Sequence, residues 1–501
     1  MKQLAQKNIL VLGLGASGLA LARWCARCGA RVTVADTRAV PPQLDALHGS
    51  VPQAKFINTG LTEALLATTT FDLVLKSPGL SPASVADVMA AAEARAITRG
   101  NELSLFVQAL ADLKIDLGYA PKLIGITGTN GKTTVTALTG QLVQRAGKLV
   151  AVAGNIGPTL LDTLAQKLDE HLNGQALPEV WVLELSSFQL DGIDNFEPTV
   201  ATVLNVTQDH LDWHGSMAAY AAAKAHVYGS SGVMLLNRDD PLVMAALPPA
   251  AKGKPPRSYL TFGSDEPRRP GDYGIEAVNG MAWLVRATPA DETLKRRRNE
   301  EAAVHIQRLM PLDALRIRGR HNATNALAAL GLAAASGCPL APMLHGLRDY
   351  RGEPHRMQSV VVVNEVEYFD DSKGTNVGAT VAALAGLGAD RKLVLILGGD
   401  GKGQDFSPLA EPVSRYVRAV VLIGRDAPRI RSALEACAIP VLDAASMSDA
   451  VAVAAQQAQG GDAILLSPAC ASFDMFDDYH HRAQVFREVV QTLAQDHGVA
   501  P

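Results

Sequence analysis

Seven consecutive residues have the composition of a loop that holds phosphate groups. They are Gly128, Thr129, Asn130, Gly131, Lys132, Thr133 and Thr134, and they follow an apolar segment, Lys122–Ile126, that predicts a strand. Glycines allow backbone N–H groups to surround phosphate oxygens, and the start of a helix adds partial positive charge. In such a loop Lys132 can reach the β- and γ-phosphates, and the Thr133 hydroxyl can hold Mg²⁺. The loop predicts a nucleoside triphosphate site, although Ile126 stands where the general motif has its first glycine.

A second glycine turn lies near the start of the chain. It contains Gly13, Gly15, Ser17 and Gly18, follows the predicted strand Asn8–Leu12, and is followed 18 residues after Gly18 by Asp36. This spacing is that of a dinucleotide-binding fingerprint, which places a pyrophosphate at a helix start. Arg38 can pair with an anionic group, and a further turn, Ser77-Pro78-Gly79, follows the predicted strand Leu73–Lys76. The pattern indicates a ligand with a pyrophosphate, of which NAD is only one example.

Glu184 and His210 follow two predicted strands between these motifs and the last third of the chain. Glu184 comes directly after Val180–Leu183, and His210 follows Val200–Leu204. A carboxylate at the carboxyl end of a strand, in a sheet that carries a phosphate loop, is well placed to bind Mg²⁺. A single histidine is more often structural, so the residue pattern alone favours Glu184 over His210 as a metal ligand.

Three polar turns follow predicted strands or precede a predicted helix in the last third of the chain. They are Asp371–Asn376, Gly398–Lys402 and Ser467–Ser472. Because the carboxyl ends of parallel strands share one edge of a sheet, the turns predict a single ligand-facing edge.

The rhythm of short apolar runs and longer helical patterns predicts three α/β domains with mainly parallel sheets. We expect a Rossmann-like domain at 1–104, a central P-loop ATP-binding domain at 105–352 and a Rossmann-like domain at 353–501. The stretch 248–309 is rich in proline, glycine and charge and predicts irregular structure, including a solvated loop at Lys295–Arg298.

The bulk composition excludes several classes of protein. The 501 residues carry 46 basic and 50 acidic side chains, a net charge of -4, which gives no nucleic-acid footprint. No apolar run reaches the roughly 18 residues of a membrane span, and the N-terminus lacks the pattern of a signal peptide. Five cysteines are too few for a disulfide framework, and Cys25 and Cys28 lie in a predicted helix, where packing is the simplest role. We expect a cytoplasmic monomer with reduced thiols and no membrane partner.

Together these motifs resemble the Mur ligases of peptidoglycan synthesis. The segments that carry the resemblance are Gly128–Thr134, Gly154–Gly157, Glu184–Gln189, Asn205–His210, His321–Asn325, Asp371–Asn376, Gly398–Lys402 and Ser467–Ser472. The resemblance covers nearly the whole chain and weakens at 169–177 and 248–309, which look like insertions. It implies an ATP-dependent carbon–nitrogen ligase, and the pattern is most similar to members that add D-glutamate to UDP-N-acetylmuramoyl-L-alanine.

The resemblance also implies roles for individual residues. For ATP it implies the phosphate loop together with Asn322, Asn325, Arg356 and Asp371. For the UDP-linked substrate it implies the Gly13–Gly18 and Ser77–Gly79 turns with Asp36, Thr37, Arg38, Asn155 and Gln189. For D-glutamate it implies Thr375, Lys402, Ser472, Phe473 and Tyr479, of which Phe473 and Tyr479 depart from the Leu and Phe expected there. For two Mg²⁺ ions it implies Thr133, Glu184, His210 and a Lys224 carbamylated by CO₂, although a helical lysine is ordinarily solvated. Lys132, Glu184, His210 and Lys224 form the implied catalytic set.

The sequence patterns leave several alternative functions open. An L-alanine-adding Mur ligase also has a nucleotide-binding first domain, but Asp371–Asn376 and Lys402 favour D-glutamate. A folylpolyglutamate synthase would share the central domain and lack the Gly13–Gly18 turn. An NAD-dependent dehydrogenase would explain that turn and leave Lys132 and Glu184 unexplained, and a non-catalytic nucleotide-binding module would need neither a second metal site nor the lysines of the third domain.

Overall fold

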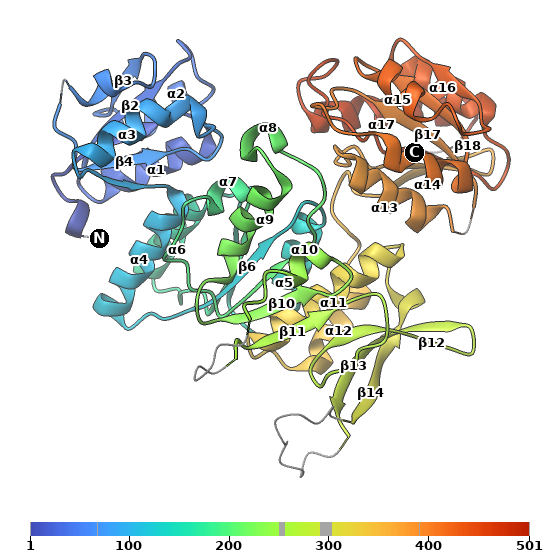
Figure 1. The fold of residues 1–501 in the computed structure, drawn as a ribbon, viewed down its shortest axis with the longest axis horizontal. Helices are drawn as coiled ribbons and strands as arrows, with labels where there is room; N and C mark the ends of the chain where they lie inside the picture. The colour runs from blue at the N-terminus through green and yellow to red at the C-terminus, as the bar shows by residue number, and fades with distance from the viewer. Residues whose placement is uncertain (1, 68, 250–255, 291–302, 390, 500–501) are drawn as a thin grey trace.

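The computed structural model describes all residues except 1, 68, 250–255, 291–302, 390 and 500–501 (Figure 1). The described chain forms three α/β domains with mainly parallel sheets, as predicted. In Figure 1 the first domain (blue) and the third (orange to red) lie on either side above the central domain. No helix in the described part of the chain is long and apolar enough to cross a membrane.

The first domain has a five-stranded parallel sheet of order β3-β2-β1-β4-β5. Its strands are β1 (Asn8–Leu12), β2 (Arg31–Asp36), β3 (Lys55–Asn58), β4 (Leu73–Lys76) and β5 (Thr98–Gly100). Its α-helices are α1 (Ala16–Arg27), α2 (Leu44–Ser50) and α3 (Ala86–Ala94). The β1–α1 connection is the Gly13–Gly18 turn, where a side chain on Gly18 would begin 2.0 Å from the Gly13 carbonyl oxygen. Only glycine fits there, so the helix start comes close to the strand end.

The central domain has a six-stranded parallel sheet of order β11-β10-β9-β6-β8-β7. Its strands are β6 (Lys122–Thr127), β7 (Val150–Gly154), β8 (Val180–Glu184), β9 (Val200–Val203), β10 (Val233–Asn237) and β11 (Tyr259–Phe262). Its α-helices are α4 (Glu102–Leu117), α5 (Lys132–Arg145), α6 (Leu160–Leu172), α7 (Ser187–Leu190), α8 (Leu211–His214), α9 (Met217–Ala225), α10 (Pro241–Met244), α11 (Arg320–Ala335) and α12 (Leu340–Asp349).

The expectation of irregular structure over 248–309 was wrong. This stretch contains β11 and most of a three-stranded antiparallel sheet formed by β12 (Tyr273–Val278), β13 (Met281–Pro289) and β14 (Val304–Pro311). Asn279 and Gly280 connect β12 to β13 with φ values of 51° and 78°. Two residues with positive φ match the twist of a tight hairpin, so the turn favours pairing of the two strands. The predicted solvated loop at Lys295–Arg298 lies outside the described residues.

The third domain has a six-stranded sheet of order β15-β16-β20-β17-β18-β19, in which only β15 runs antiparallel to its neighbour. Its strands are β15 (Gln358–Val363), β16 (Val366–Asp370), β17 (Leu393–Gly398), β18 (Val417–Ile423), β19 (Val441–Asp443) and β20 (Ala463–Leu466). Its α-helices are α13 (Val377–Leu387), α14 (Ala410–Tyr416), α15 (Ala427–Ala433), α16 (Met447–Gln457) and α17 (Tyr479–Asp496).

Short 3₁₀ helices occur in all three domains. They are η1 (Lys2–Leu4), η2 (Glu63–Leu66), η3 (Ala83–Val85), η4 (His226–Tyr228), η5 (Leu312–Ala314) and η6 (Ser407–Leu409).

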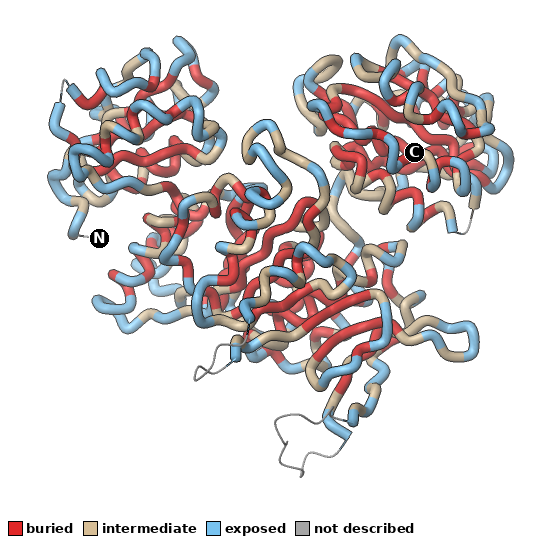
Figure 2. Tube along the Cα trace, in the orientation of Figure 1, coloured by how far each residue is buried: buried red, intermediate tan, exposed pale blue. Residues whose placement is uncertain are grey.

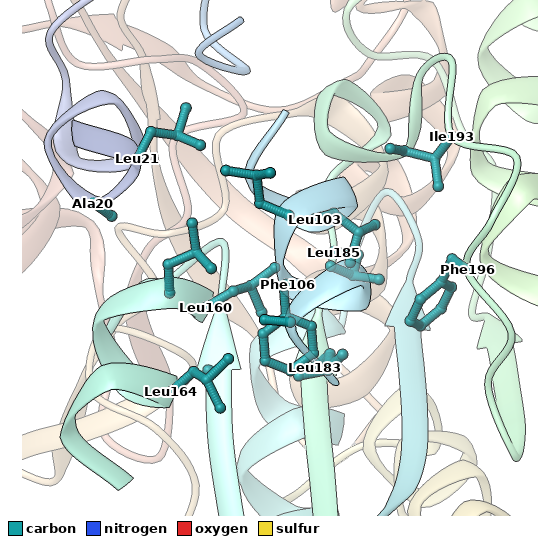
Figure 3. Packing of buried hydrophobic residues seen from close by; sticks show 14 of the residues in the cluster. Ala20, Leu21, Leu103, Phe106, Leu160, Leu164, Leu183, Leu185, Ile193 and Phe196 are labelled. Carbon is teal, nitrogen blue, oxygen red and sulfur yellow. The ribbon is translucent and has the colours of Figure 1, made fainter. Parts of the chain in front are cut away.

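Buried residues are concentrated in the inner strands of the three large sheets, whereas edge strands such as β3 and β5 include exposed residues (Figure 2). The first and central domains share one core: Leu21 of α1, Phe106 of α4, Leu164 of α6 and Leu183 of β8 belong to a single hydrophobic cluster (Figure 3). Because the cluster crosses from α1 to the central domain, apolar burial holds the first domain against it. Cys25 is buried in this core, as expected for a packing cysteine.

Candidate active site

The phosphate loop connects β6 to α5 and is wrapped around its own lysine. Gly128 and Gly131 have φ values of 156° and 82°, which lie in a range that favours glycine. The Lys132 ammonium donates to the carbonyl oxygens of Gly128 and Thr129, both at 2.8 Å. Burial lowers the pKa of Lys132, while the charge of Glu184 opposes this shift. The loop therefore has the shape and charge of a phosphate site.

Glu184 is the last residue of β8, the strand next to the loop strand β6. Its side chain is buried, and Oε1 accepts a hydrogen bond from Asn155 Nδ2 at 3.2 Å. Its Oε2 is buried and has no hydrogen-bond partner within the described structure. A buried carboxylate oxygen without a donor is costly, and a hard cation would satisfy it. Glu184 thus fits the expected role of a Mg²⁺ ligand.

Lys224 is buried in α9, contrary to what its composition alone suggests for a helical lysine. Its ammonium donates to the Gly128 carbonyl oxygen at 2.9 Å and lies 4.4 Å from the centre of the Tyr220 ring. Burial, and then the positive charge of Lys132, hold the pKa of Lys224 well below its usual range. A lowered pKa favours the neutral amine, which is the form that reacts with CO₂.

His210 lies at the start of α8 with a left-handed φ of 53°. Burial lowers the pKa of His210 below 6.5, and the charges of Lys402, Lys132 and Lys224 act in the same direction. The neutral imidazole is the form that ligates metals. Three lysines from two domains therefore lie within electrostatic reach of one histidine. No group of three His, Cys, Asp or Glu side chains forms a ready metal site among the described residues, so phosphate oxygens or water would have to complete a metal's coordination.

A cleft of about 280 Å³ lies between the central and third domains beside the phosphate loop. Its lining includes seven residues of the expected ATP site: Asn130, Gly131, Thr134, Asn322, Asn325, Arg356 and Asp371. Arg356 Nη2 donates to Thr133 Oγ1 at 2.7 Å. The side-chain amides of Asn130 and Asn376 bond to each other reciprocally, at 3.2 and 3.0 Å. These contacts bring the third domain directly onto the phosphate loop.

Two titratable groups of the third domain have shifted pKa values beside this cleft. Burial raises the pKa of Asp371 to about 7, against the hydrogen bond that its carboxylate accepts from Ser467 Oγ at 2.7 Å. Burial lowers the pKa of Lys373 to about 8, and its ammonium lies 3.6 Å from the centre of the Tyr479 ring. Sequence reasoning did not single out Lys373, although it lies inside the Asp371–Asn376 motif.

The glycine turn of the first domain connects β1 to α1, as predicted, and the arginine expected to meet an anionic group is already paired. Asp36 accepts from the Leu14 backbone N–H at 2.7 Å and from the Arg38 guanidinium at 2.9 and 2.8 Å. The Arg38 hydrogen bonds are the main cause that lowers the pKa of Asp36 to about 2. Ser77, the first residue of the Ser77–Gly79 turn, is buried next to this edge, and Thr37 is exposed. Gln189 caps α7 by accepting from the Ser186 N–H at 3.0 Å, and its carbonyl oxygen accepts from Asn101 Nδ2 at 3.0 Å.

The three polar turns of the third domain meet at one sheet edge, as predicted. They follow β16, β17 and β20, which are neighbours, and Asp400 pairs with Ala471 across two of the turns. Lys402 has a left-handed φ of 50° and is exposed, whereas Ser472 is buried. Phe473 is 70% exposed, and Tyr479 begins α17 with its carbonyl accepting from Ser372 Oγ at 2.9 Å. Thr375 is partly buried in the first of these turns.

Comparison with known proteins agrees with this geometry. Three family models match in order: the Mur ligase MurD-like N-terminal domain at 7–98, the Mur ligase middle domain at 126–333 and the Mur ligase glutamate ligase domain at 355–470. The chain therefore belongs to the Mur ligase family and is an ATP-dependent ligase.

Particular relatives are highly similar along their whole length. A UDP-N-acetylmuramoylalanine–D-glutamate ligase of Albidiferax ferrireducens is 66% identical over 504 residues, covering 100% of this chain and 99% of the relative. A protein of the same name from Polaromonas is 58% identical and covers 100% of both chains. Among solved structures, MurF from Acinetobacter baumannii aligns with a TM-score of 0.57 at 18% identity over 97% of this chain and 92% of that one. UDP-N-acetylmuramate-alanine ligase from Thermotoga maritima aligns with a TM-score of 0.55 at 19% identity, over 97% of this chain and 100% of that one. These two similarities show the fold.

Proposed function

We propose that the protein joins D-glutamate to UDP-N-acetylmuramoyl-L-alanine in peptidoglycan synthesis, with conversion of ATP to ADP and phosphate. The observation that carries the proposal is the contact of the third domain with the phosphate loop, through Arg356 to Thr133 and Asn376 to Asn130. It puts the expected amino-acid domain next to the expected ATP site. The 66% identical relative with that name supports the choice of substrates.

The reaction requires two anions to meet. A carboxylate oxygen of the alanyl group attacks the γ-phosphorus of ATP, and ADP leaves. The amine of D-glutamate then attacks the acyl phosphate, losing a proton and releasing phosphate as the amide forms. The Lys132 ammonium and the Arg356 guanidinium supply positive charge where the transferred phosphoryl group lies. Bound Mg²⁺ would neutralise phosphate charge, with Glu184, His210 and the Thr133 hydroxyl as the protein groups that fit it.

Each substrate has a proposed set of contacts, and the sets for ATP and for the UDP-linked substrate each draw on two domains, whose boundaries fall near residues 104 and 352. Asn322, Asn325 and Asp371 would hold ATP beside the loop. The Gly13–Gly18 and Ser77–Gly79 turns, with Asp36, Thr37 and Arg38, would hold the UDP part, and Asn155 and Gln189 the muramoyl-alanine end. The proposed role of Asn155 is supported by the hydrogen bond that it donates to Glu184, because this contact places Asn155 beside the proposed metal ligand. Because one chain supplies all of these residues, the protein would act as a monomer. Its free cysteines are typical of a cytoplasmic protein, which is the proposed location.

The amino-acid substrate would lie at the edge formed by the three turns of the third domain. Lys402 can meet a carboxylate as a mobile point charge, with Thr375 and Ser472 as hydrogen-bond donors and Phe473 and Tyr479 as apolar neighbours. Lys402→Ala should raise the KM for D-glutamate far more than that for the UDP-linked substrate. Lys402→Asn is the backbone-matched comparison, because asparagine tolerates the left-handed conformation. Equal effects on both KM values would mean that Lys402 has a structural role.

The proposal includes carbamylation of Lys224 and a second Mg²⁺. The neutral amine adds CO₂ and loses a proton, which gives a carbamate with two oxygens and one negative charge. Buried position, lowered pKa and the nearby Lys132 charge support this reaction. NMR of the protein in ¹³C-labelled bicarbonate should show one carbamate carbon that Lys224→Ala lacks, together with a severe loss of activity and little change in thermal stability. A spectrum without that signal, from fully active enzyme, would refute the modification.

The direct test of the function uses purified protein, ATP, Mg²⁺ and UDP-N-acetylmuramoyl-L-alanine. Phosphate release should require an added amino acid and should be fastest with D-glutamate, and mass spectrometry should show the corresponding amide. UDP-N-acetylmuramate with L-alanine tests the alternative member of the family. A faster reaction with L-alanine would overturn the choice of substrate and leave the family assignment intact.

A further inference from the structure

A buried lysine that the proposed function does not use lies between the first and central domains. Lys76 is the last residue of β4, and only 8% of its surface is exposed. Its ammonium lies 5.0 Å from the centre of the Trp213 ring of α8. Among the described residues, the ammonium makes no hydrogen bond and no ion pair. The indole Nε1 of Trp213 is also buried and has no hydrogen-bond partner there.

The position of this pair points to a ligand. Lys76 is in register with Leu12 on the adjacent strand β1, and Leu12 directly precedes Gly13. Lys76 therefore lies at the sheet edge that carries the Gly13–Gly18 and Ser77–Gly79 turns. Trp213 lies three residues after His210, on the central-domain side of the same gap. Lys76 also lines a cavity of about 840 Å³ whose lining includes Asn101 and Asp191, whereas Trp213 and the two glycine turns lie outside that lining.

The charge balance at Lys76 is incomplete without a ligand. Burial lowers the pKa of Lys76, and the charge of Asp191 opposes this shift, although no ion pair joins the two within the described part of the chain. The Lys76 ammonium has no acceptor among the described residues but is not fully enclosed, and attraction to an aromatic face supplies only part of the interaction that an anion would give it. Two unpartnered donors, one of them cationic, call for an anionic oxygen. A phosphate oxygen has the charge and the acceptor capacity that both donors lack.

We propose that Lys76 and Trp213 bind the diphosphate of the UDP-linked substrate from opposite sides of the gap between the first and central domains. This inference rests on the proposed function, because it takes its ligand from the substrate assigned there. The diphosphate would then contact the first domain through Lys76 and the α8 segment that follows His210 through Trp213. Substrate binding would in this way fix the first domain relative to the reaction centre.

The test compares UDP and uridine binding to the wild-type protein and to two variants by NMR titration. Lys76→Met keeps the apolar stem and removes the charge, and Trp213→Phe keeps a ring and removes the donor. We expect Lys76→Met to weaken UDP binding roughly 10- to 100-fold, the scale of a charge-assisted hydrogen bond. Trp213→Phe should weaken it about fivefold, the scale of a neutral hydrogen bond. Neither should change uridine binding. Lys55→Met, an exposed lysine of β3 in the same domain, is the matched control and should change nothing.

Thermal unfolding without ligand separates binding from a purely structural role. Because the Lys76 ammonium forms no hydrogen bond or ion pair with the described residues, Lys76→Met should melt at the same temperature as the wild type or higher. The inference would be overturned if Lys76→Met bound UDP with unchanged affinity, or if it lost affinity for UDP and uridine equally. It would also be overturned if Trp213→Phe bound UDP with unchanged affinity but melted at a lower temperature, because Trp213 would then have a purely structural role. A wild-type protein that does not bind UDP would instead refute the proposed substrate.

Discussion

The ammonium groups of Lys132 and Lys224 donate to one acceptor, the carbonyl oxygen of Gly128, at 2.8 and 2.9 Å. The two lysines come from different helices, α5 and α9, and are brought together only by the folded loop. Burial lowers the pKa of both, and Lys132 further lowers the pKa of Lys224. The Lys132 charge is then available for the negative charge of a triphosphate, while the same charge favours the neutral amine of Lys224 that carbamylation requires.

Removal of the Lys132 charge should abolish most of the activity and leave the fold intact. Lys132→Ala should lower turnover by at least ~10²-fold, the scale of losing one preorganised charge stabiliser. The measurement is phosphate release, with circular dichroism to check the fold. Lys148→Ala is the control, because Lys148 is a partly exposed lysine just after α5 that forms an ion pair with Glu179. Near wild-type phosphate release by Lys132→Ala would mean that the loop does not act on ATP.

Glu184→Gln should separate metal binding from stability. The substitution keeps the shape of the side chain and removes the charge from a buried oxygen without a partner, so the ligand-free protein should be no less stable. The rise in melting temperature caused by Mg²⁺ with ADP should disappear, because metal binding to the folded state is its source. Glu179→Gln, an exposed glutamate directly before β8, should retain the full rise. A full Mg²⁺-dependent rise in Glu184→Gln would exclude this residue as a ligand.

The amide pair between Asn130 and Asn376 should couple the third domain to the phosphate loop. Asn376 also caps α13 by accepting from the Ala379 N–H at 2.9 Å. Asn376→Asp keeps that acceptor and loses only the donor to Asn130, whereas Asn376→Ala loses both. In a double-mutant cycle with Asn130→Ala, we expect a coupling of about 0.5–1.5 kcal/mol in kcat/KM for ATP. Additive effects of the two substitutions would show that the contact does not contribute to turnover.

The raised pKa of Asp371 predicts the direction in which the stability of the folded protein changes with pH. The folded carboxyl keeps its proton between pH 3.8 and about 7, a range in which the unfolded carboxyl has lost it. The folded state therefore binds more protons, so this group's contribution to the free energy of unfolding falls as pH rises through that window. The stability of the wild type relative to Asp371→Asn, from urea unfolding, should fall from pH 4 to 7 and then level off. A pH-independent difference would contradict the buried, protonated carboxyl.

Local patterns in the sequence predicted most of the fold. The range of β1 was predicted without error, and Glu184 lies at the end of β8 because the apolar run that precedes it forms the strand. The antiparallel sheet was missed although its signal was present: Asn279-Gly280 lies between two segments that pair as β12 and β13. The proline, glycine and charge content of the surrounding stretch outweighed this hairpin signal in the sequence interpretation.

Contacts between domains were beyond the reach of sequence patterns. Lys76 and Trp213 are 137 positions apart in the sequence, and their approach depends on how the shared core places α1 against the central domain. The pairing of Arg38 with Asp36 could have been expected, since the two lie at the end of one strand. The burial of Lys224 could be expected only from the family resemblance, because its alanine-rich helix shows no amphipathic pattern that distinguishes the lysine face.

The central claim is that ATP activates the alanyl carboxylate as an acyl phosphate. It is tested most directly with UDP-N-acetylmuramoyl-L-alanine labelled with ¹⁸O in both oxygens of that carboxylate. After reaction with ATP and D-glutamate, mass spectrometry of the products follows the label. The account predicts one ¹⁸O in the released phosphate and one in the new amide, because the oxygen that attacks phosphorus leaves with it. Phosphate without ¹⁸O, formed together with the amide, would contradict it.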